Sequence, residues 1–196
     1  MNEINFWNNI RFMFVIFTDK NGLYSSWPGI GYLVSAIKRE IPDLSIDVRI
    51  FDLKDVDVAV KEIYNYKEKM IIGLSLYQHN FKASMKFSRM IKNARDDIHI
   101  VAGNVEASAF PKSIMEDCPC IDSIIVGEGE YVLPDLITCI INKDFSKCKN
   151  IYYRIEEKIE CNCIIEEFVD VNNLYFPDRS FMSTKVNCFD IVGSRG

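Results

Sequence analysis

Small and acidic residues follow two apolar runs of this sequence, in a pattern that suits ligand binding. Residues 102–108 read Ala-Gly-Asn-Val-Glu-Ala-Ser, and residues 126–130 read Val-Gly-Glu-Gly-Glu. Glycine lets a ligand approach bare backbone, and the first turn of a following helix offers free N–H groups. Glu128 and Glu130 could suggest acid–base chemistry, but no nucleophile or partner base accompanies them. The pattern therefore predicts binding and helix capping rather than catalysis.

An earlier loop, at residues 18–29, is longer than the roughly 2–6 residues usual between a strand and a helix. Tyr24 and Trp27 could supply flat apolar walls, and Gly29 and Gly31 permit close backbone approach where the helix begins. The two glycines are not a dinucleotide fingerprint, because the third glycine is replaced by valine, and no Gly-Lys-Ser/Thr sequence marks a phosphate loop. The loop could also be an ordinary cap and turn.

Another loop, at residues 75–80, contains His79, one of two histidines in the chain. An imidazole there could donate a hydrogen bond to a ligand or coordinate a metal, or it could simply be exposed. Between the first two roles we expect the hydrogen bond, so that replacing His79 by alanine would weaken binding only slightly and leave the spectrum of a bound cofactor unchanged. The other histidine, His99, opens an apolar strand, and we interpret it as structural.

Apolar runs alternate with helical patterns along most of the chain, at the spacing expected for βα repeats. Continuous apolar runs are typical of strands buried on both faces, whereas alternation of apolar and polar residues at 46–51 suits an edge strand. The alternation predicts the α/β class, as a flavodoxin-like or Rossmann-like five-stranded parallel sheet with helices on both faces. The predicted strands are residues 12–17, 46–51, 70–75, 99–102 and 123–126, and the predicted helices are residues 30–40, 55–66, 83–94, 111–116 and 130–142.

The predicted topology also places the candidate site. Open parallel sheets bind ligands beyond the carboxyl ends of their strands, where the strand order reverses, and in the flavodoxin-like order this point lies between the first and third strands. The four loops should therefore meet at one edge of the sheet. We assign no residue to catalysis or to metal coordination. The candidate cofactor-binding residues are Thr18, Asp19, Tyr24, Trp27, Pro28, Gly29, Gly31, Ser75, Leu76, Tyr77, Gln78, His79, Asn80, Gly103, Asn104, Glu106, Gly127, Glu128, Gly129 and Glu130.

The sequence changes character after residue 145, and we predict a second region at 146–196 that follows an α/β domain at 1–145. Residues 151–154 and 161–165 flank charged residues and predict a hairpin packed on the side of the sheet. Residues 170–184 are rich in Asn, Pro, Asp and Ser and predict a linker. We expect a further, poorly anchored strand at 187–192.

Composition narrows the class of protein. The net charge of −5 argues against a nucleic-acid-binding surface. No signal peptide is visible, and no apolar run approaches the ~18–20 residues that cross a membrane, so we expect a cytoplasmic protein without membrane contact. The seven cysteines are an odd number without the C-x-x-C spacing of zinc or iron–sulfur sites, and we interpret them as free thiols.

Several of these segments together resemble the cobalamin-binding N-terminal domain of cobalamin-dependent radical S-adenosylmethionine enzymes. The resemblance rests on residues 27–33, residues 102–111 and above all residues 121–130 with their Gly-Glu-Gly-Glu motif. Pro177-Asp178-Arg179 and Ser194-Arg195-Gly196 are similar to that family's bridge into its catalytic barrel. The resemblance implies that the four loops hold the corrin ring and nucleotide tail of cobalamin, and that this domain is not catalytic alone.

The sequence departs from the family's pattern in three ways. In the family the Ser-Arg-Gly turn precedes C-x-x-x-C-x-x-C, whose thiolates hold the [4Fe–4S] cluster that cleaves S-adenosylmethionine, and this chain ends just before that motif. The cluster and S-adenosylmethionine are therefore expected only in an intact family member. Gly103-Asn104 replaces a common Gly-Gly, which restricts backbone approach. Residues 19–22 lack the histidine of the D-x-H-x-x-G motif, so no lower cobalt ligand is expected from that loop.

Two rival interpretations stay open. A degenerate module of the same fold could have lost the ligand and bind a protein partner, which the departure at Asn104 and the missing barrel favour. A flavin- or nucleotide-binding flavodoxin-like protein is the other rival, although residues 19–22 lack the Ser, Thr and Gly of a flavodoxin phosphate loop. The expected partners are thus cobalamin, with a protein partner or the catalytic barrel, and neither nucleic acid nor a membrane.

Overall fold

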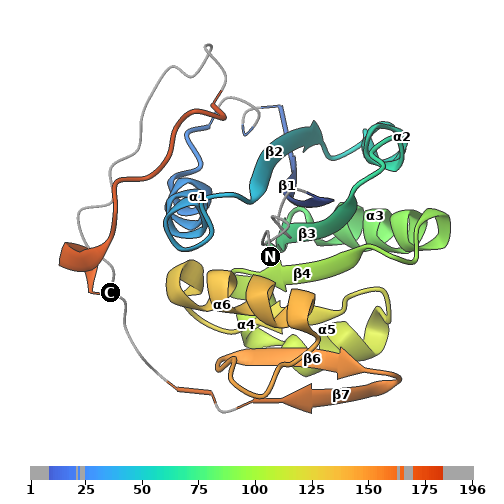
Figure 1. Ribbon diagram of the computed structural model, residues 1–196. Helices are drawn as coiled ribbons and strands as arrows, with labels where there is room; N and C mark the ends of the chain where they lie inside the picture. The colour runs from blue at the N-terminus through green and yellow to red at the C-terminus, as the bar shows by residue number, and fades with distance from the viewer. Residues whose placement is uncertain (1–8, 21, 23–24, 163, 166–169, 183–196) are drawn as a thin grey trace.

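The computed structural model describes residues 9–20, 22, 25–162, 164–165 and 170–182 (Figure 1). Strands and helices alternate along this part of the chain, as predicted. The elements are β1 (Ile10–Thr18), α1 (Pro28–Glu40), β2 (Ser45–Asp52), α2 (Val56–Tyr64), β3 (Lys69–Ser75), α3 (Phe81–Ala94), β4 (His99–Gly103), α4 (Val105–Ala109), α5 (Pro111–Asp117), β5 (Ser123–Ile125), α6 (Gly129–Asn142), β6 (Ile151–Ile155), β7 (Lys158–Cys161) and a 3-10 turn, η3 (Val171–Asn173).

The sheet has the strand order β2-β1-β3-β4-β5-β6-β7. Strands β1 to β5 are parallel and lie in the predicted order, with helices on both faces, which confirms the α/β, Rossmann-like fold. The predicted number of strands, five, was too low. The predicted hairpin, β6 and β7, does not pack on the side of the sheet but adds two strands to its edge. Strand β6 pairs antiparallel with β5, where Ser123 lies opposite Tyr153, and this covers backbone groups that an edge strand would expose.

Two smaller differences concern the bounds and type of elements. The second strand of the hairpin lies at Lys158–Cys161 instead of residues 161–165, because the turn needs only Glu156 and Glu157, with Glu156 at a φ of 54°. A short helix, α4, occupies most of the segment 103–108 that was interpreted as a loop. The predicted strand at 187–192 lies outside the described residues, and the division at residue 145 stays a prediction.

The two faces of the sheet are covered by different helices. We call the face under α2, α3, α4 and α5 the closed face; its core includes Met13, Ile72 and Phe87. We call the face under α1 and α6 the open face; its core includes Phe14 and Ile137. Successive residues of a strand point to opposite faces, so the apolar runs predicted as buried strands supply both cores.

The predicted linker is held against α1 over its described part (Figure 1). We call residues 174–182 the strap. The Ser35 hydroxyl donates to the carbonyl of Phe176 at 2.8 Å, the Asp178 N–H donates to the carbonyl of Gly31 at 3.0 Å, and Lys38 pairs with Asp178 at 2.6 Å. A side chain at Gly31 would collide with the strap, since its Cβ would lie 2.6 Å from the Asp178 carbonyl oxygen. Glycine at this position therefore allows the strap to pack closely against α1.

In the part of the chain that is described, no helix combines the length and the apolar character that crossing a membrane requires.

Candidate functional site

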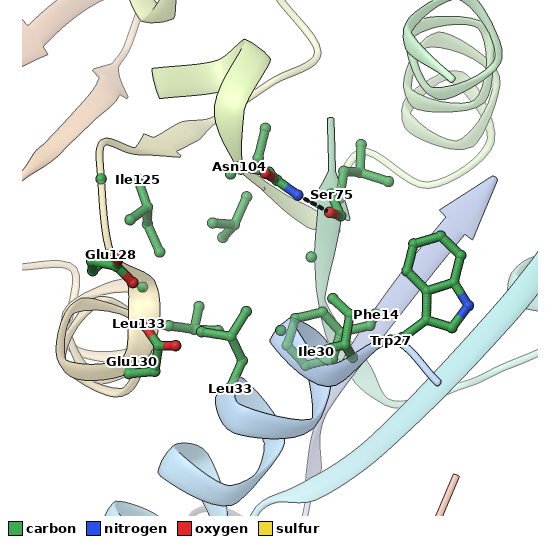
Figure 2. Close-up of a pocket in the computed structure, with 18 of the residues that line it drawn as sticks. Phe14, Trp27, Ile30, Leu33, Ser75, Asn104, Ile125, Glu128, Glu130 and Leu133 are labelled. Atoms are coloured by element: carbon green, nitrogen blue, oxygen red, sulfur yellow. Dashed lines mark hydrogen bonds between the residues drawn. The ribbon is translucent and has the colours of Figure 1, made fainter. Parts of the chain in front are cut away.

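A cavity of about 330 Å³ lies on the open face between α1 and α6 (Figure 2). Its floor is the sheet itself, through side chains such as Phe14, Val101 and Ile125, and its walls include Leu33 of α1 and Leu133 of α6. Loop residues after β1, β3, β4 and β5 form the rim, so the cavity reaches the carboxyl edge of the sheet. This is the place where the predicted topology put the ligand.

A glycine in the middle of β3 makes room on the floor. A Cβ at Gly73 would lie 2.9 Å from Phe12 Cζ and 3.1 Å from Phe14 Cδ1. The two rings pack edge to face with centroids 4.8 Å apart. Glycine thus leaves room for both aromatic rings beside the strand, where they offer an apolar surface to the cavity.

A second glycine brings the two walls together. A Cβ at Gly129, the first residue of α6, would lie 2.9 Å from Leu33 Cδ2 of α1. The next residue, Glu130, is only 5% exposed and lines the cavity from the first turn of α6. A carboxylate there interacts favourably with the amino end of a helix.

The rim between β3 and β4 is formed by Asn104, in an unusual conformation. Its φ of 82° and ψ of −174° lie in a region used almost only by glycine, which costs on the order of 1–3 kcal/mol for other residues. The Asn104 Oδ1 accepts a hydrogen bond from Val105 N–H at 2.7 Å, and Nδ2 donates to Ser75 Oγ at 2.8 Å (Figure 2). These bonds offset the strain, so the departure from Gly-Gly adds a polar bridge to the rim.

Many of the predicted site residues meet at this cavity. They come from loops that are far apart in sequence, as the convergence of parallel strands requires. The predicted residues that line it are Trp27, Pro28, Gly29, Ser75, Tyr77, Gly103, Asn104, Gly127, Glu128, Gly129 and Glu130. Tyr24 lies outside the described residues.

Other predicted residues lie away from the cavity and serve the fold. Leu76 is fully buried in the core of the closed face. Asn80 is fully buried too, and its amide donates to the carbonyls of Phe17 and Ser75 at 3.1 and 2.9 Å. It thereby joins the ends of β1 and β3. Gly31 contacts the strap, as described above.

The remaining predicted residues are Thr18, Asp19, Gln78, His79 and Glu106, which are also absent from the cavity lining. Asp19 accepts a hydrogen bond from Gly22 N–H at 2.9 Å and shapes its own loop. His79 is exposed and stacks on Tyr77 with ring centroids 5.5 Å apart. His79 therefore adjoins a residue of the cavity without lining it.

Sequence reasoning missed the apolar interior of the cavity. A glycine inside an otherwise apolar strand, as at Gly73, was the one local signal that something lies close to the sheet there. The residues that were not predicted as site residues are Phe12, Phe14, Ile30, Leu33, Gly73, Leu74, Val101, Ala102, Ile125 and Leu133.

Titratable groups outside the cavity behave as structural groups. Burial lowers the pKa of His99 to about 4, and its Nε2 lies 2.9 Å from Ser123 Oγ. Burial raises the pKa of the Cys148 thiol to about 12. The cysteines within the described ranges, at positions 118, 120, 139, 148 and 161, are free thiols, and no group of three or more His, Cys, Asp or Glu in those ranges is arranged to hold a metal ion.

A known protein family matches the part of the chain that forms the cavity. The family model described as "B12 binding domain" matches residues 23–137. This range runs from the loop after β1 into α6, and it includes both walls of the cavity. This chain belongs to the B12-binding domain family. The resemblance predicted from the sequence is thus confirmed at the level of the family.

Curated relatives of this B12-binding domain are longer proteins. An uncharacterized methyltransferase of Pyrococcus horikoshii is 26% identical over 115 residues, which are 57% of this chain and 24% of the relative. The cobalamin-dependent radical SAM methyltransferase TokK of Streptomyces tokunonensis is 30% identical over 70 residues, or 36% of this chain and 10% of the relative. The chain thus spans a quarter or less of these relatives.

Solved structures share the fold. The cobalamin-dependent S-adenosylmethionine radical enzyme OxsB, solved with aqua-cobalamin and S-adenosylmethionine, matches 81% of this chain with a TM-score of 0.64 and 22% identity. The methyltransferase TsrM of Kitasatospora setae, solved with cobalamin and a [4Fe–4S] cluster, matches 87% with a TM-score of 0.62 and 16% identity. The matches cover 22% and 32% of those chains, respectively.

Proposed function

We propose that this domain binds cobalamin at the carboxyl edge of β1, β3, β4 and β5, with one end of the ligand inside the cavity. The observation that carries the proposal is the cavity itself, an apolar space of about 330 Å³ between α1 and α6 in a chain of the B12-binding domain family. Small-molecule sites in proteins start at about this volume. A whole corrinoid is far larger, so we propose that the nucleotide tail enters and the corrin ring stays outside.

The residues present fit these two parts of the ligand. The floor and walls are apolar and aromatic, which suits the flat heteroaromatic base of the tail. At the rim, a Cβ built on Gly29, Gly103 or Gly127 would meet no atom within 4 Å. A large planar ring can approach bare backbone at such positions. The predicted residues that line the cavity are therefore proposed as the cofactor-binding residues.

Neither histidine of the chain lines the cavity, since His79 is exposed beside Tyr77 and His99 lies at the other end of the strands. We propose that this domain provides no imidazole ligand to cobalt. His79→Ala should then leave the absorption spectrum of bound cobalamin unchanged. A large spectral change in this variant would contradict the proposal.

We further propose that the bound cofactor serves methyl transfer by a radical S-adenosylmethionine domain of the whole protein. Support comes from the two relatives described above, which are both named methyltransferases. TokK is named a cobalamin-dependent radical SAM methyltransferase. When bound, cobalamin supplies a cobalt centre that can carry a methyl group. The residues of this domain would hold and orient the cofactor, while the iron–sulfur cluster and S-adenosylmethionine would belong to the other domain.

The direct test is retention of hydroxocobalamin after gel filtration, with the protein at tens of micromolar. The domain should retain the corrinoid with a shifted absorption band. Gly103→Phe should abolish retention, because the position is open and its new ring would fill the rim. Val58→Phe, at an exposed position of α2 on the closed face, is the matched control and should retain it.

Loss of retention in the wild type would overturn the proposal and favour a degenerate interaction module. Equal retention by Gly103→Phe would show that the ligand binds elsewhere. The same column run with flavin mononucleotide separates the remaining rival, since a flavodoxin-like protein would retain flavin and stay yellow.

A further inference from the structure

The charged residues of helix α3 (Phe81–Ala94) are all positive, in a chain whose net charge is −5. Lys86 and Lys92 each pair with an aspartate from outside the helix, at 3.2 and 2.8 Å. Among the described residues, no carboxylate forms an ion pair with the other two cations of the helix, Lys82 and Arg89. Positive charge is therefore left over at two positions of α3.

The same two cations line a groove on the surface of the closed face, which we call the α3 groove. It has a volume of about 560 Å³ and lies between α3 and the end of α5. The Arg89 guanidinium donates to the carbonyl of Asp117 at 3.2 Å, so one hydrogen bond joins its two sides. Its lining residues are Phe81, Lys82, Met85, Arg89, Asp117 and Cys118, and none of these lines the cavity between α1 and α6.

The α3 groove has an apolar floor and a positive rim. Met85 is only 4% exposed and Cys118 is fully buried, whereas Lys82 and Arg89 are exposed. Asp117 is the single acid among the described lining residues, so positive charge exceeds negative charge there. An apolar surface flanked by cations favours a partner that is itself amphipathic and acidic.

The spacing of the two cations indicates the form of that partner. Lys82 and Arg89 are seven positions apart on one helix, which places them about 10 Å apart along its axis. A single phosphate or carboxylate is too small to contact both. Two carboxylates at positions i and i+7 of a second helix have the matching separation and lie on one face of that helix.

We propose that the α3 groove is a docking site for an amphipathic acidic helix of a partner protein. Its carboxylates at positions i and i+7 pair with Lys82 and Arg89, and the apolar side chains between them enter the groove over Met85. The inference goes beyond cobalamin binding and does not depend on it, because the groove and the cavity share no residue.

The probe is a synthetic helical peptide with glutamate at positions i and i+7 and leucine at i+3 and i+4, titrated with the domain by fluorescence anisotropy. We expect saturable binding at low salt. Raising the salt from about 0.1 M to 1 M shortens the Debye length from about 10 Å to about 3 Å and should weaken the binding. A peptide with lysine at the two glutamate positions should bind the wild type more weakly than the glutamate peptide does.

Exchanging the charges between protein and peptide is the decisive experiment. Lys82→Glu with Arg89→Glu should lower the affinity for the glutamate peptide about tenfold, since two ion pairs become two repulsions. The same double variant should bind the lysine peptide more tightly than the wild type does, which a misfolded protein could not do. Lys82→Gln with Arg89→Gln adds no repulsion toward Asp117 and should give a smaller loss for the glutamate peptide.

Lys61→Glu with Lys147→Glu is the matched control, because it makes the same change in net charge at two exposed positions outside the α3 groove. It should bind the glutamate peptide as the wild type does. An equal loss in this control would show that only the net charge matters and would overturn the proposal.

Three further outcomes would also overturn it. They are the absence of binding to the glutamate peptide, undiminished binding after the charge reversal at Lys82 and Arg89, and no gain for the lysine peptide in that variant. Sedimentation of the domain alone tests a second copy as the occupant. Self-association that the charge reversal abolishes would replace the partner helix by a second copy of this chain.

Discussion

The two faces of the sheet are built from the same strands but are filled differently. On the closed face, side chains such as Ile72 of β3 and Phe87 of α3 are fully buried between the sheet and the helices that cover it. On the open face, the neighbouring position in β3 is Gly73, and a cavity of about 330 Å³ takes the place of packed side chains. Close packing stabilises a core. We therefore expect the closed face to contribute more to the stability of the fold, whereas the open face has room for a ligand.

Truncating a side chain on each face should give the largest difference. Ile72→Ala should lower the free energy of unfolding by about 2–5 kcal/mol, because it creates a new cavity in a filled core. Leu133→Ala should lie toward the small end of that range, because Leu133 already borders a cavity. Urea unfolding of both variants measures this. An equal or larger loss at Leu133 would contradict the comparison.

The pH dependence of stability tests whether the open face is tightly packed at the amino ends of the strands, away from the cavity. His99 lies at the amino end of β4 and stacks on Phe145 with ring centroids 6.3 Å apart. Its pKa is lowered from 6.5 to about 4 by burial, so the native state resists protonation that the unfolded state accepts. Stability from this group is complete above pH 6.5 and is lost as the pH falls toward 4, by roughly 3 kcal/mol.

His99→Gln should remove this slope, because glutamine does not titrate and can still reach Ser123. The measurement is the free energy of unfolding by urea at several pH values between 4 and 7. An unchanged slope in the variant would mean that other groups cause the pH dependence, and that the amino end of the open face is not tightly packed around His99.

Adding one methyl group to the floor of the cavity should have a smaller effect on stability. Gly73→Ala should lower the free energy of unfolding by about 1–3 kcal/mol, since its Cβ would press on the rings of Phe12 and Phe14. It should also weaken cobalamin binding, because the displaced rings would enter the cavity. Gly103→Ala is the control, with no atom within 4 Å of its Cβ, and should change stability by no more than ~0.5 kcal/mol. Similar losses in both variants would contradict this account of the floor.

The smallest change in stability is expected at the strap. Gly31→Ala would force the strap away from α1, but alanine favours the helix by up to about 1 kcal/mol, so the two effects should nearly cancel. The measurable result is faster tryptic cleavage after Arg179, which lies in the strap. Gly29→Ala, on the same helix but with no atom near its Cβ, should leave the cleavage rate unchanged. An unchanged rate in Gly31→Ala would show that the strap is not held by this contact.

Much of the site could be predicted because its position follows from topology. Apolar runs at residues 12–17 and 70–75 indicate buried parallel strands, and parallel strands bring their carboxyl ends to one edge. That reasoning brought Trp27, Ser75, Asn104 and Glu130 together correctly. It failed for Leu76 and Asn80, which share a loop with Ser75 but point into the fold.

The sequence by itself determined the class of fold, the order of the parallel strands and the edge where the loops meet, because periodicity and chain connectivity are local or topological properties. Only the tertiary structure decided which residues line the cavity. Gly31 faces the strap, Gly129 faces Leu33, and Asn104 reaches Ser75, all across long stretches of sequence. The residues that contact a loop residue in space come from segments remote in the chain. A pattern of residues that are neighbours in the sequence cannot show which remote segment lies close.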